Sequence, residues 1–520
     1  MKTNQSQVTR AAALVMGAFA VSRLLGLVRQ IVFSLYFGTG PEMDAYVGAL
    51  RIPDMLFLVI AGGALGSAFI PVFTARLTHD DHTGAWRLAS AVINLLLVVI
   101  VPVSLLAMAL APWIVRTVIA PALSPAIQQR TVALMRVMLI STAIFGVSGV
   151  IMGILNAHQH FLLPALAPIL YNVAIIAGAI WGGLTEVGAM GPAIAMVVGA
   201  CLHLGVQLPE LFRRGARYTL TLGLRDHAVR TVGRLMAPRV LGVAAVQLNM
   251  VITTGLASGL GQGAISALDY AWRLMLLPQG IFAQAVGTAV FPTFSAQAAR
   301  GDFAELRQTL MSMMRTLVAI VLPATAGLIV LGQPLIGAVF ERGAFTAAST
   351  QEVSRALVFF ALGLIGHSLI EILARAFYAL QNTWTPAVAA VGAMLLNLAL
   401  GLTLPGVFVR FSWLPVGGLA LANALAALVE LMALILVMDR QLHGLRLGKM
   451  LRWLLRPLGA SLAMASVVLG WLWIAPVGDI VRSAGGVTLG VGTYVAFAWL
   501  LGVDELQLAI RRIVGRAVPV

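Results

Sequence analysis

The chain has 520 residues, of which 60% are hydrophobic and only 10% are charged, and its mean hydropathy is +0.96. A soluble globular domain carries about 25% charged residues, so this composition excludes a soluble protein despite the net charge of +15. Apolar runs of about 20 residues recur along the whole chain, and each is long enough to cross a bilayer as a helix. The sequence therefore predicts an all-α integral membrane protein that crosses the membrane many times.

Fourteen apolar segments follow one another and predict fourteen transmembrane helices. Their approximate bounds are 9–37, 42–76, 86–118, 129–157, 161–184, 188–211, 230–259, 263–295, 305–338, 351–380, 384–406, 413–438, 452–475 and 483–503. A membrane β-barrel would instead show short segments of alternating polarity. We expect no cleavable signal peptide, because the first segment is long and contains internal arginines.

Basic residues in the connectors predict the orientation of the chain in the membrane. They gather in connectors such as "RRGAR" (213–217) and "RLGKMLRWLLR" (446–456), whereas 38–43, 185–188 and 259–262 contain no lysine or arginine. By the positive-inside rule both termini face the cytoplasm, which requires an even number of spans. The same basic residues are expected to attract anionic lipid headgroups, and no nucleic-acid partner is predicted.

The chain also repeats itself. "ALGSAFIPVFTA" (64–75) recurs as "AVGTAVFPTFSA" (285–296), an offset that spans six helices. Because six is even, the two copies have the same orientation, which is the parallel-repeat plan of transporters that bind substrate in a central cavity between the halves. We therefore predict two six-helix repeats, 1–220 and 221–440, followed by two further helices and a cytoplasmic tail in 441–520.

Ionisable residues inside predicted spans are the candidates for the binding site, because such residues usually face a cavity or a partner. Six are basic and four are acidic: Arg23, Arg29, Asp44, Arg51 and Asp54 in the first repeat, and Arg239, Asp269, Arg273, Glu371 and Arg375 in the second. Arginine keeps its charge and can bind phosphate oxygens with two hydrogen bonds. The excess of arginine favours an anionic, phosphorylated substrate.

Spacing suggests roles for individual members of this set. Arg23 and Arg273 lie deep and are the first candidates to contact substrate, whereas Arg29 and Arg51 can also be explained by snorkelling or structural ion pairs. Asp269 lies four residues before Arg273. On one helix face this spacing permits an ion pair.

Three further features concern packing and coupling. Ser22 with Gly26 has the spacing that lets two helices approach closely, and Asp54 lies three residues after Arg51, within reach of a pair on one face. His367 and Glu371 are four residues apart in one span. They form a candidate site for a coupling proton or cation, so that H⁺, Na⁺ or the membrane potential could drive transport.

The remaining motifs do not indicate a metal site, a disulfide or an active site. "HDDH" (79–82) and "HQH" (158–160) fall in predicted connectors and read as solvated loops, and no metal site is predicted. Cys201 is the only cysteine, so no intramolecular disulfide can form. The sequence has no nucleotide-binding loop, dinucleotide fingerprint or nucleophile elbow, so we expect a transporter that uses no cofactor rather than an enzyme.

Several stretches together resemble one family of membrane transporters. They are "SRLLGLVRQ", "MDAYVGALRIPDML", "GGALGSAFIPVF", "WRLMLLPQGIFAQAVGTAVFPTFS", "GILNAHQHFLLPALAP", "VFERGAFTAAST" and "RAFYALQNTWTPA". In combination they are similar to the MurJ (MviN) family, the lipid II flippases of the multidrug/oligosaccharidyl-lipid/polysaccharide exporter superfamily. The resemblance covers about residues 10–440.

The resemblance implies a MATE-like bundle in the bacterial cytoplasmic membrane that moves undecaprenyl-diphosphate-linked disaccharide pentapeptide to the outer leaflet by alternating access. Under it, Arg23, Arg29 and Arg273 bind the diphosphate, Arg51 stands where the family has lysine or arginine, and Asp44 is a further cavity charge. The lipid tail follows a groove lined by the last two helices. Membrane lipids and the cell-wall synthesis machinery, which determines cell shape, are the implied partners.

Some polar residues of the family pattern are replaced in this chain. The replacements stand at Gln30, Phe57, Leu58, Gly62 and Trp272. They leave open a second hypothesis, that the substrate is another polyprenyl-linked oligosaccharide or amphiphile. An exporter of cationic drugs is disfavoured by the basic cavity, and a membrane scaffold would have no use for charges inside its spans.

Overall fold

The structure is a computed structural model of the chain, and it describes residues 2–60, 63–445, 447–475, 478–503 and 505. Within these ranges it describes no side chain at 2–16, 19, 63–67, 235, 237–239, 241 and 447. The regular elements of the described ranges are helices, as the composition predicts.

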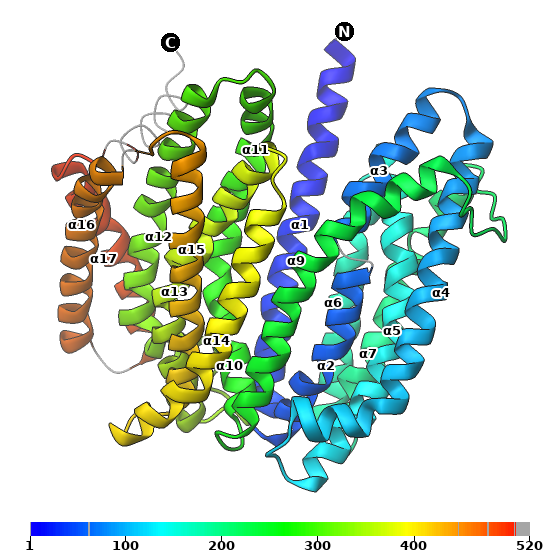
Figure 1. Ribbon diagram of the computed structural model, residues 1–520. Helices are drawn as coiled ribbons and strands as arrows, with labels where there is room; N and C mark the ends of the chain where they lie inside the picture. Colours follow the sequence, from blue (N-terminus) through cyan, green and yellow to red (C-terminus); the bar gives the residue numbers. More distant parts are fainter. Residues whose placement is uncertain (1, 61–62, 446, 476–477, 504, 506–520) are drawn as a thin grey trace. The chain divides into compact units, whose positions relative to one another are not determined.

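The helices have the following bounds in chain order (Figure 1). They are α1 (Lys2–Phe37), α2 (Pro41–Ile60), α3 (Gly63–Thr78), α4 (His82–Ile114), η1 (Val115–Ile119), α5 (Pro125–Ala157), α6 (Leu162–Leu184), α7 (Met190–Gly205), α8 (Leu208–Arg213), α9 (His227–Ser258), α10 (Ala264–Pro278), η2 (Gln279–Ala283), α11 (Gln284–Ala299), α12 (Phe303–Phe340), α13 (Ala347–Ala379), α14 (Trp384–Arg410), α15 (Val416–Gln441), α16 (Leu447–Ile474) and α17 (Asp479–Leu500).

Among the described residues, 12 helical stretches are long and apolar enough to cross a membrane. Two of the fourteen predicted segments, 42–76 and 230–259, do not meet that criterion. The first contains α2 and α3, which lie on either side of residues 61–62, outside the described residues, and α2 carries four charged residues within 20. In α9 the apolar stretch found among the described side chains is Gly242–Ser258, which begins directly after residue 241, whose side chain is not described. Both segments adjoin residues outside the described set, so they stay predicted spans.

Short polar signals set several helix boundaries outside the apolar runs. The carboxylate of Asp81 accepts a hydrogen bond from the Gly84 N–H and so caps α4, and Asp302 caps α12 in the same way through the Glu305 N–H. These contacts satisfy N–H groups that a helix leaves without intrahelical partners. They place the ends of the long helices, and with them the connectors.

The chain divides into two compact units. Unit 1 contains residues 1–266 together with Arg342–Phe345. In it α5 packs against α2, α4 and α7, α6 packs against α1 and α7, and α9 packs against α2 and α3. Its apolar core includes Phe69, Phe73 and Leu88, which are fully buried.

Unit 2 contains residues 267–341 and 346–520. Here α13 packs against α12 and α15, α14 packs against α15, and the α16–α17 hairpin lies against α12 (Figure 1). A hydrogen bond from the buried Tyr494 hydroxyl to the Ala319 carbonyl fixes the hairpin on α12. The sequence duplication, with its predicted limits at 220 and 440, stays a prediction.

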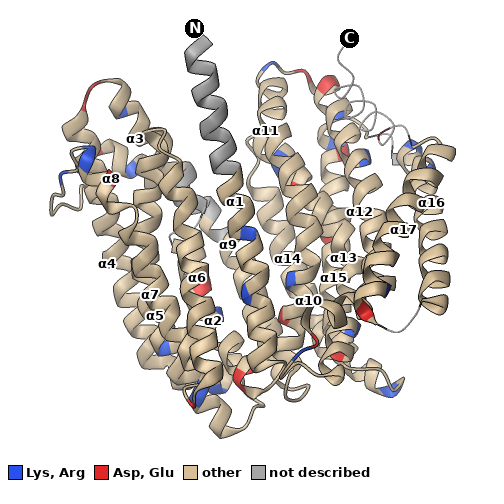
Figure 2. Cartoon of the chain, turned by 180° about the vertical axis from the view of Figure 1, so that it is seen from behind, with Lys and Arg blue, Asp and Glu red and all other residues tan. Residues whose placement is uncertain are grey.

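Charged residues lie mostly near the ends of the helices, and a smaller number lie within the apolar helices (Figure 2). Charge near a helix end can reach water or lipid headgroups, whereas charge within a span requires a partner or a cavity. The second group is therefore the one that defines the candidate site.

Candidate substrate-binding site

The two arginines of α1 lie at positions that its own unit leaves wholly or partly exposed. Arg23 is exposed and Arg29 is half-buried, and between them Leu24 is 63% exposed. A Cβ added at Gly26 would meet no atom of unit 1 within 4 Å. Six residues of helix separate the two arginines, which turns their side chains roughly 120° apart. Among the described residues of unit 1, neither guanidinium has a hydrogen bond or a carboxylate partner.

Asp44 of α2 is fully buried and bonded to the segment that begins α10. Its carboxylate accepts hydrogen bonds from the Gly263 N–H (2.6 Å), the Ser266 N–H (2.8 Å) and the Ser266 hydroxyl (2.8 Å). Three donors on one carboxylate compensate for much of its loss of hydration. Asp44 therefore ties the first half of the chain to residues that follow it by about 220 positions.

Arg51 and Asp54 occupy the next turns of α2, and both are half-buried. The Arg51 Nε donates a hydrogen bond to the Thr254 hydroxyl of α9 at 2.8 Å, and this hydroxyl in turn donates to the Met250 carbonyl. Arg51 thus joins α2 to α9 through a neutral group.

In unit 2, Asp269 and Arg273 of α10 form the ion pair that their spacing predicts. The Arg273 Nε lies 2.5 Å from the Asp269 carboxylate, which is only 3% exposed, whereas the Arg273 side chain is 33% exposed. Tyr270, between them in sequence, is buried against Phe340. The carboxylate is therefore held inside, and the guanidinium extends towards the surface of the unit.

His367 and Glu371 of α13 each have a different partner. The His367 Nε2 lies 3.1 Å from the Asn423 amide oxygen of α15, and the imidazole ring packs edge-on against Trp272. Glu371 accepts a hydrogen bond from Arg375 at 2.5 Å. Arg375 also fills the space beside Gly287 of α11, where a Cβ would meet the guanidinium. A joint role of His367 and Glu371 in coupling stays a prediction.

Other predicted positions complete this description. Ser22 is half-buried on α1. The side chain of Arg239 and all of Gly62 lie outside the described residues. At the positions where the family pattern is replaced, Gln30 is buried, the Phe57 ring packs at a tilt against Phe145, and Trp272 packs against Phe360. Apolar contacts thus occupy some places where the family pattern has charge.

Three polar residues of interest were not among the sequence candidates. Thr254 and Ser266 bond to Arg51 and Asp44, and hydroxyl residues in an apolar helix give no sequence signal of their own. Glu430 is a half-buried carboxylate inside α15. A single acidic residue within the apolar segment 413–438 was the available signal for it, by the same rule that selected Glu371.

The geometry of these residues is suited to binding and not to covalent chemistry. Among the described residues, no group of three or more His, Cys, Asp or Glu side chains could hold a metal ion. Arg23 and Arg29 of α1 have no carboxylate partner among the described residues of unit 1, and Arg273 is paired with Asp269. Such a set can bind an anionic group reversibly.

These features define the class of protein: a multi-pass membrane transporter with the helical fold of the multidrug/oligosaccharidyl-lipid/polysaccharide superfamily. An inward-facing multidrug MATE transporter of this superfamily has the same fold, with a TM-score of 0.69 at 17% identity over 84% of this chain and 99% of that one. A solved lipid II flippase MurJ in an inward closed conformation is more similar, with a TM-score of 0.78 and 26% identity over 95% and 99% of the two chains.

Sequence comparison identifies the family. The model of the lipid II flippase MurJ family matches residues 33–477. The lipid II flippase MurJ of Burkholderia cenocepacia is 30% identical over 95% of this chain and 97% of its own length. A probable lipid II flippase MurJ of Rhizobium tropici is 29% identical over 97% and 96%. The chain belongs to the MurJ family, and it is therefore a transporter of the inner membrane and not an enzyme.

Proposed function

We propose that this protein carries lipid II, the undecaprenyl-diphosphate-linked precursor of peptidoglycan, from the inner to the outer leaflet of the membrane. Family membership supports the substrate and the transport activity. The observation that carries the proposal is the state of Arg23 and Arg29, two permanent charges on an apolar helix that have no partner among the described residues of their unit. A diphosphate supplies the oxygens that such guanidinium groups bind.

The residues proposed to bind the diphosphate are arginines within each unit. They are Arg23, Arg29 and Arg51 in unit 1 and Arg273 in unit 2. Ser22, Asp44, Asp54 and Arg239 in unit 1, and Asp269 in unit 2, are proposed to form ion pairs in the cavity or to act in gating. Because Asp269 remains bonded to Arg273, the guanidinium can bind an anion only with its remaining donors.

The transport step that we propose is alternating access. Fourteen spans, formed by the 12 apolar stretches together with the α2–α3 and α9 segments, place both termini in the cytoplasm. Two parallel six-helix repeats then surround a central cavity that opens to one leaflet at a time. The hydrogen bonds of Asp44 to Gly263 and Ser266 are suited to gating, because they can form or break as a unit.

Energy for net transport is proposed to come from the membrane potential or from an H⁺ or Na⁺ gradient, with His367 and Glu371 as the candidate coupling residues. The cell-wall synthesis machinery is the proposed partner that uses lipid II in the outer leaflet. Neither role requires a bound cofactor.

The test is delivery of lipid II to the outer leaflet. Cells depleted of their own flippase should accumulate lipid II inside, and expression of this chain should restore both growth and labelling of lipid II by a membrane-impermeant reagent. The Arg225→Ala variant, changed at an exposed connector residue, should restore labelling equally. Failure of the unmodified chain to restore labelling, when it is present in the membrane, would overturn the proposal.

A second candidate substrate is another polyprenyl-linked oligosaccharide. The observation in its favour is the replacement of family polar residues by Gln30, Phe57, Leu58 and Trp272. Parallel assays with lipid II and with an undecaprenyl-diphosphate-linked O-antigen-type sugar distinguish the two, because both present the same diphosphate to the arginines and differ in the sugar. If only the second lipid is transported, that lipid is the substrate.

A further inference from the structure

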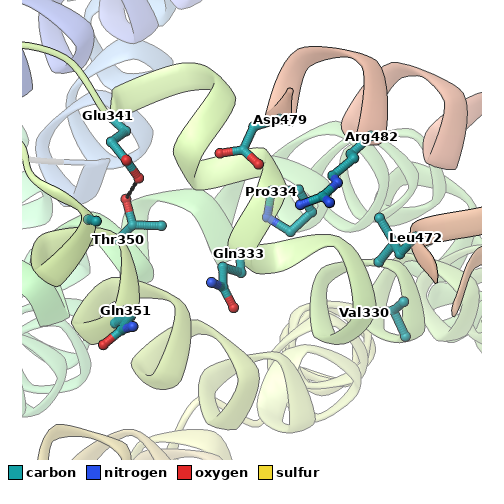
Figure 3. A pocket seen from close by; sticks show the side chains of 10 residues that line it. Val330, Gln333, Pro334, Glu341, Thr350, Gln351, Leu472, Asp479 and Arg482 are labelled. Atoms are coloured by element: carbon teal, nitrogen blue, oxygen red, sulfur yellow. Dashed lines mark hydrogen bonds between the residues drawn. The ribbon is translucent and has the colours of Figure 1, made fainter. Parts of the chain in front are cut away.

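A polar pocket of about 400 Å³ lies inside unit 2, and the charged residues of α10 and α13 described above are not among those that line it. It is formed by the C-terminal part of α12, the first turns of α13, the end of α16 and the start of α17 (Figure 3). The charged residues that line it are Glu341, Asp479 and Arg482. None of them belongs to the proposed lipid II site, so the pocket needs an explanation of its own.

The first turn of α17 contributes one negative and one positive side chain to this pocket. Figure 3 shows Asp479 and Arg482 extending from α17 beside Pro334 of α12. The Arg482 Nε is buried and has no hydrogen-bond partner among the described residues. A buried guanidinium nitrogen without an acceptor is costly, and an acceptor supplied by a ligand would remove that cost.

The two carboxylates are held in place by backbone and hydroxyl contacts. Asp479 lies so close to Gly337 of α12 that a Cβ at this glycine would overlap with the carboxylate. Glu341 accepts a hydrogen bond from the Thr350 hydroxyl of α13 at 2.5 Å, as Figure 3 shows. Each carboxylate keeps oxygen lone pairs for a further donor. The pocket therefore offers acceptors for a cation next to donors for an anion.

The surroundings of the pocket are suited to lipid. At the neighbouring ends of the α16–α17 hairpin, Trp473 is 94% exposed, Ile474 is 80% exposed and Ile480 is 64% exposed. The Trp471 Nε1 donates to the Arg482 carbonyl at 3.1 Å and so fixes the two helix ends together. Tryptophan and exposed aliphatic side chains at the end of a span mark the level of lipid headgroups.

From this arrangement we propose that the pocket binds the phosphoethanolamine headgroup of a membrane phospholipid. The phosphate accepts hydrogen bonds from Arg482 and lies near the free N–H groups at the α17 N-terminus, where a helix favours negative charge. The ammonium group donates to Asp479 and Glu341. The acyl chains extend along the apolar side chains of the hairpin. This site is independent of the proposed transport of lipid II.

The chemistry discriminates among common phospholipids. Phosphatidylglycerol has the phosphate but no ammonium group for the carboxylates. Phosphatidylcholine has a positive charge but no N–H donors, and its three methyl groups enlarge the headgroup. Phosphatidylethanolamine alone of the three satisfies both parts of the pocket.

The test is lipid retention measured by native mass spectrometry of the purified full-length protein in detergent. With equal amounts of the three phospholipids, we expect at least threefold more bound phosphatidylethanolamine than either of the others. Equal retention of all three would overturn the proposal, and this comparison requires no variant. Free O-phosphoethanolamine added in excess tests whether the ligand is the lipid or the free headgroup compound. If the free compound does not displace the lipid, the ligand is a membrane lipid. If it does, the pocket recognises the headgroup itself.

Two variants separate the two parts of the headgroup. Arg482→Gln should lower retention of phosphatidylethanolamine to the level of phosphatidylcholine, because the phosphate loses its charged donor. Asp479→Asn should remove the preference over phosphatidylglycerol while leaving some phosphate binding. The matched control is Arg410→Gln, at an exposed arginine of α14, which should leave retention unchanged. Unchanged retention in a folded Arg482→Gln variant would contradict the proposal.

Discussion

The charged residues of the two units are neutralised in different ways. In unit 2, each of two arginines has a carboxylate four residues earlier on its own helix: Asp269 for Arg273 and Glu371 for Arg375. In unit 1, Arg23 and Arg29 have no such carboxylate, while Asp44 is bonded to backbone and hydroxyl donors far away in sequence. These two arginines of unit 2 are therefore paired locally, whereas Arg23 and Arg29 of α1 have no carboxylate partner among the described residues of unit 1.

Arginines that look alike in the sequence should therefore have different functions. An arginine without a carboxylate keeps its full charge for a ligand, but it contributes little to the folding of its unit. An arginine paired with a buried carboxylate contributes to stability, because its loss leaves that carboxylate without compensation. Substitutions in the two units should accordingly separate transport from stability.

The largest effect is expected at α1. Arg23→Ala and Arg29→Ala should each lower the labelling of lipid II at the outer face by roughly 10- to 100-fold, the range for loss of one charged hydrogen-bonding group. Thermal unfolding of the purified variants should change little, because neither side chain has a partner among the residues that the structure describes in its unit. A large loss of stability with normal labelling of lipid II would contradict the proposed difference between the arginines of the two units.

Arg273→Ala should primarily destabilise the protein. Asp269 is only 3% exposed, so removal of its partner should lower the free energy of unfolding. Because Arg273 is partly exposed, we expect the loss to lie near the lower end of roughly 3–5 kcal/mol. The double variant Asp269→Ala/Arg273→Ala should recover much of this stability in thermal unfolding. If Arg273 also binds diphosphate, labelling of lipid II stays low in the double variant, and recovery of labelling would limit Arg273 to a structural role.

A smaller effect is expected at Asp44. Asp44→Asn should cost about 1.5–3 kcal/mol, because the amide replaces a charged acceptor and turns one N–H group towards a donor. Ser266→Ala removes only one of the three hydrogen bonds and should cost about 1 kcal/mol. Amide hydrogen exchange at residues 263–266 should accelerate more in the first variant than in the second. The opposite order would mean that the hydroxyl, and not the carboxylate, holds this segment.

The smallest effect concerns an ion pair in unit 1 between the last turn of α3 and the N-cap of α9. Arg76 and Asp226 are 2.8 Å apart and both are partly exposed. Burial opposes ionisation of Asp226, but the hydrogen bond from the Ala228 N–H and the Arg76 guanidinium outweigh it and hold the pKa of this carboxyl below its usual range. The pair should contribute about 1 kcal/mol or less.

Because folding lowers the pKa of Asp226, its contribution is complete at a pH well above the unfolded-state value of about 3.9. It is lost as the pH falls from there through the folded-state pKa. Thermal unfolding of the Asp226→Asn variant should therefore differ from that of the unmodified protein at neutral pH and converge with it in acid. Asp80→Asn, at an exposed carboxylate, serves as the control and should show no such convergence.

Most of the fold could be predicted from the sequence, because apolar length alone defines a membrane helix. The exceptions were local. Segment 42–76 contains α2, which ends at Ile60, and α3, which begins at Gly63, with residues 61–62 outside the described residues. The count of fourteen spans depends on α2–α3 and α9, whose charges weaken the signal on which the count rests.

The candidate site was predictable only to the extent that its contacts are local. The Asp269–Arg273 pair followed from a spacing of four residues, since such side chains meet on one helix face. The contacts of Asp44 with Ser266 and of Arg51 with Thr254 did not, because they join residues more than 200 positions apart. Serine and threonine inside an apolar helix give no indication of which distant carboxylate or guanidinium they will bind.

Residues Arg342–Phe345 belong to unit 1, although the chain on either side of them belongs to unit 2. The Ala344 N–H donates to the Leu35 carbonyl at 2.9 Å, and Gly38 leaves no room for a Cβ beside Ala344. A gene divided after Ser266 would therefore not encode two self-sufficient fragments. The second fragment would carry the four residues that complete the first, so the halves of a split protein should depend on each other for reassembly.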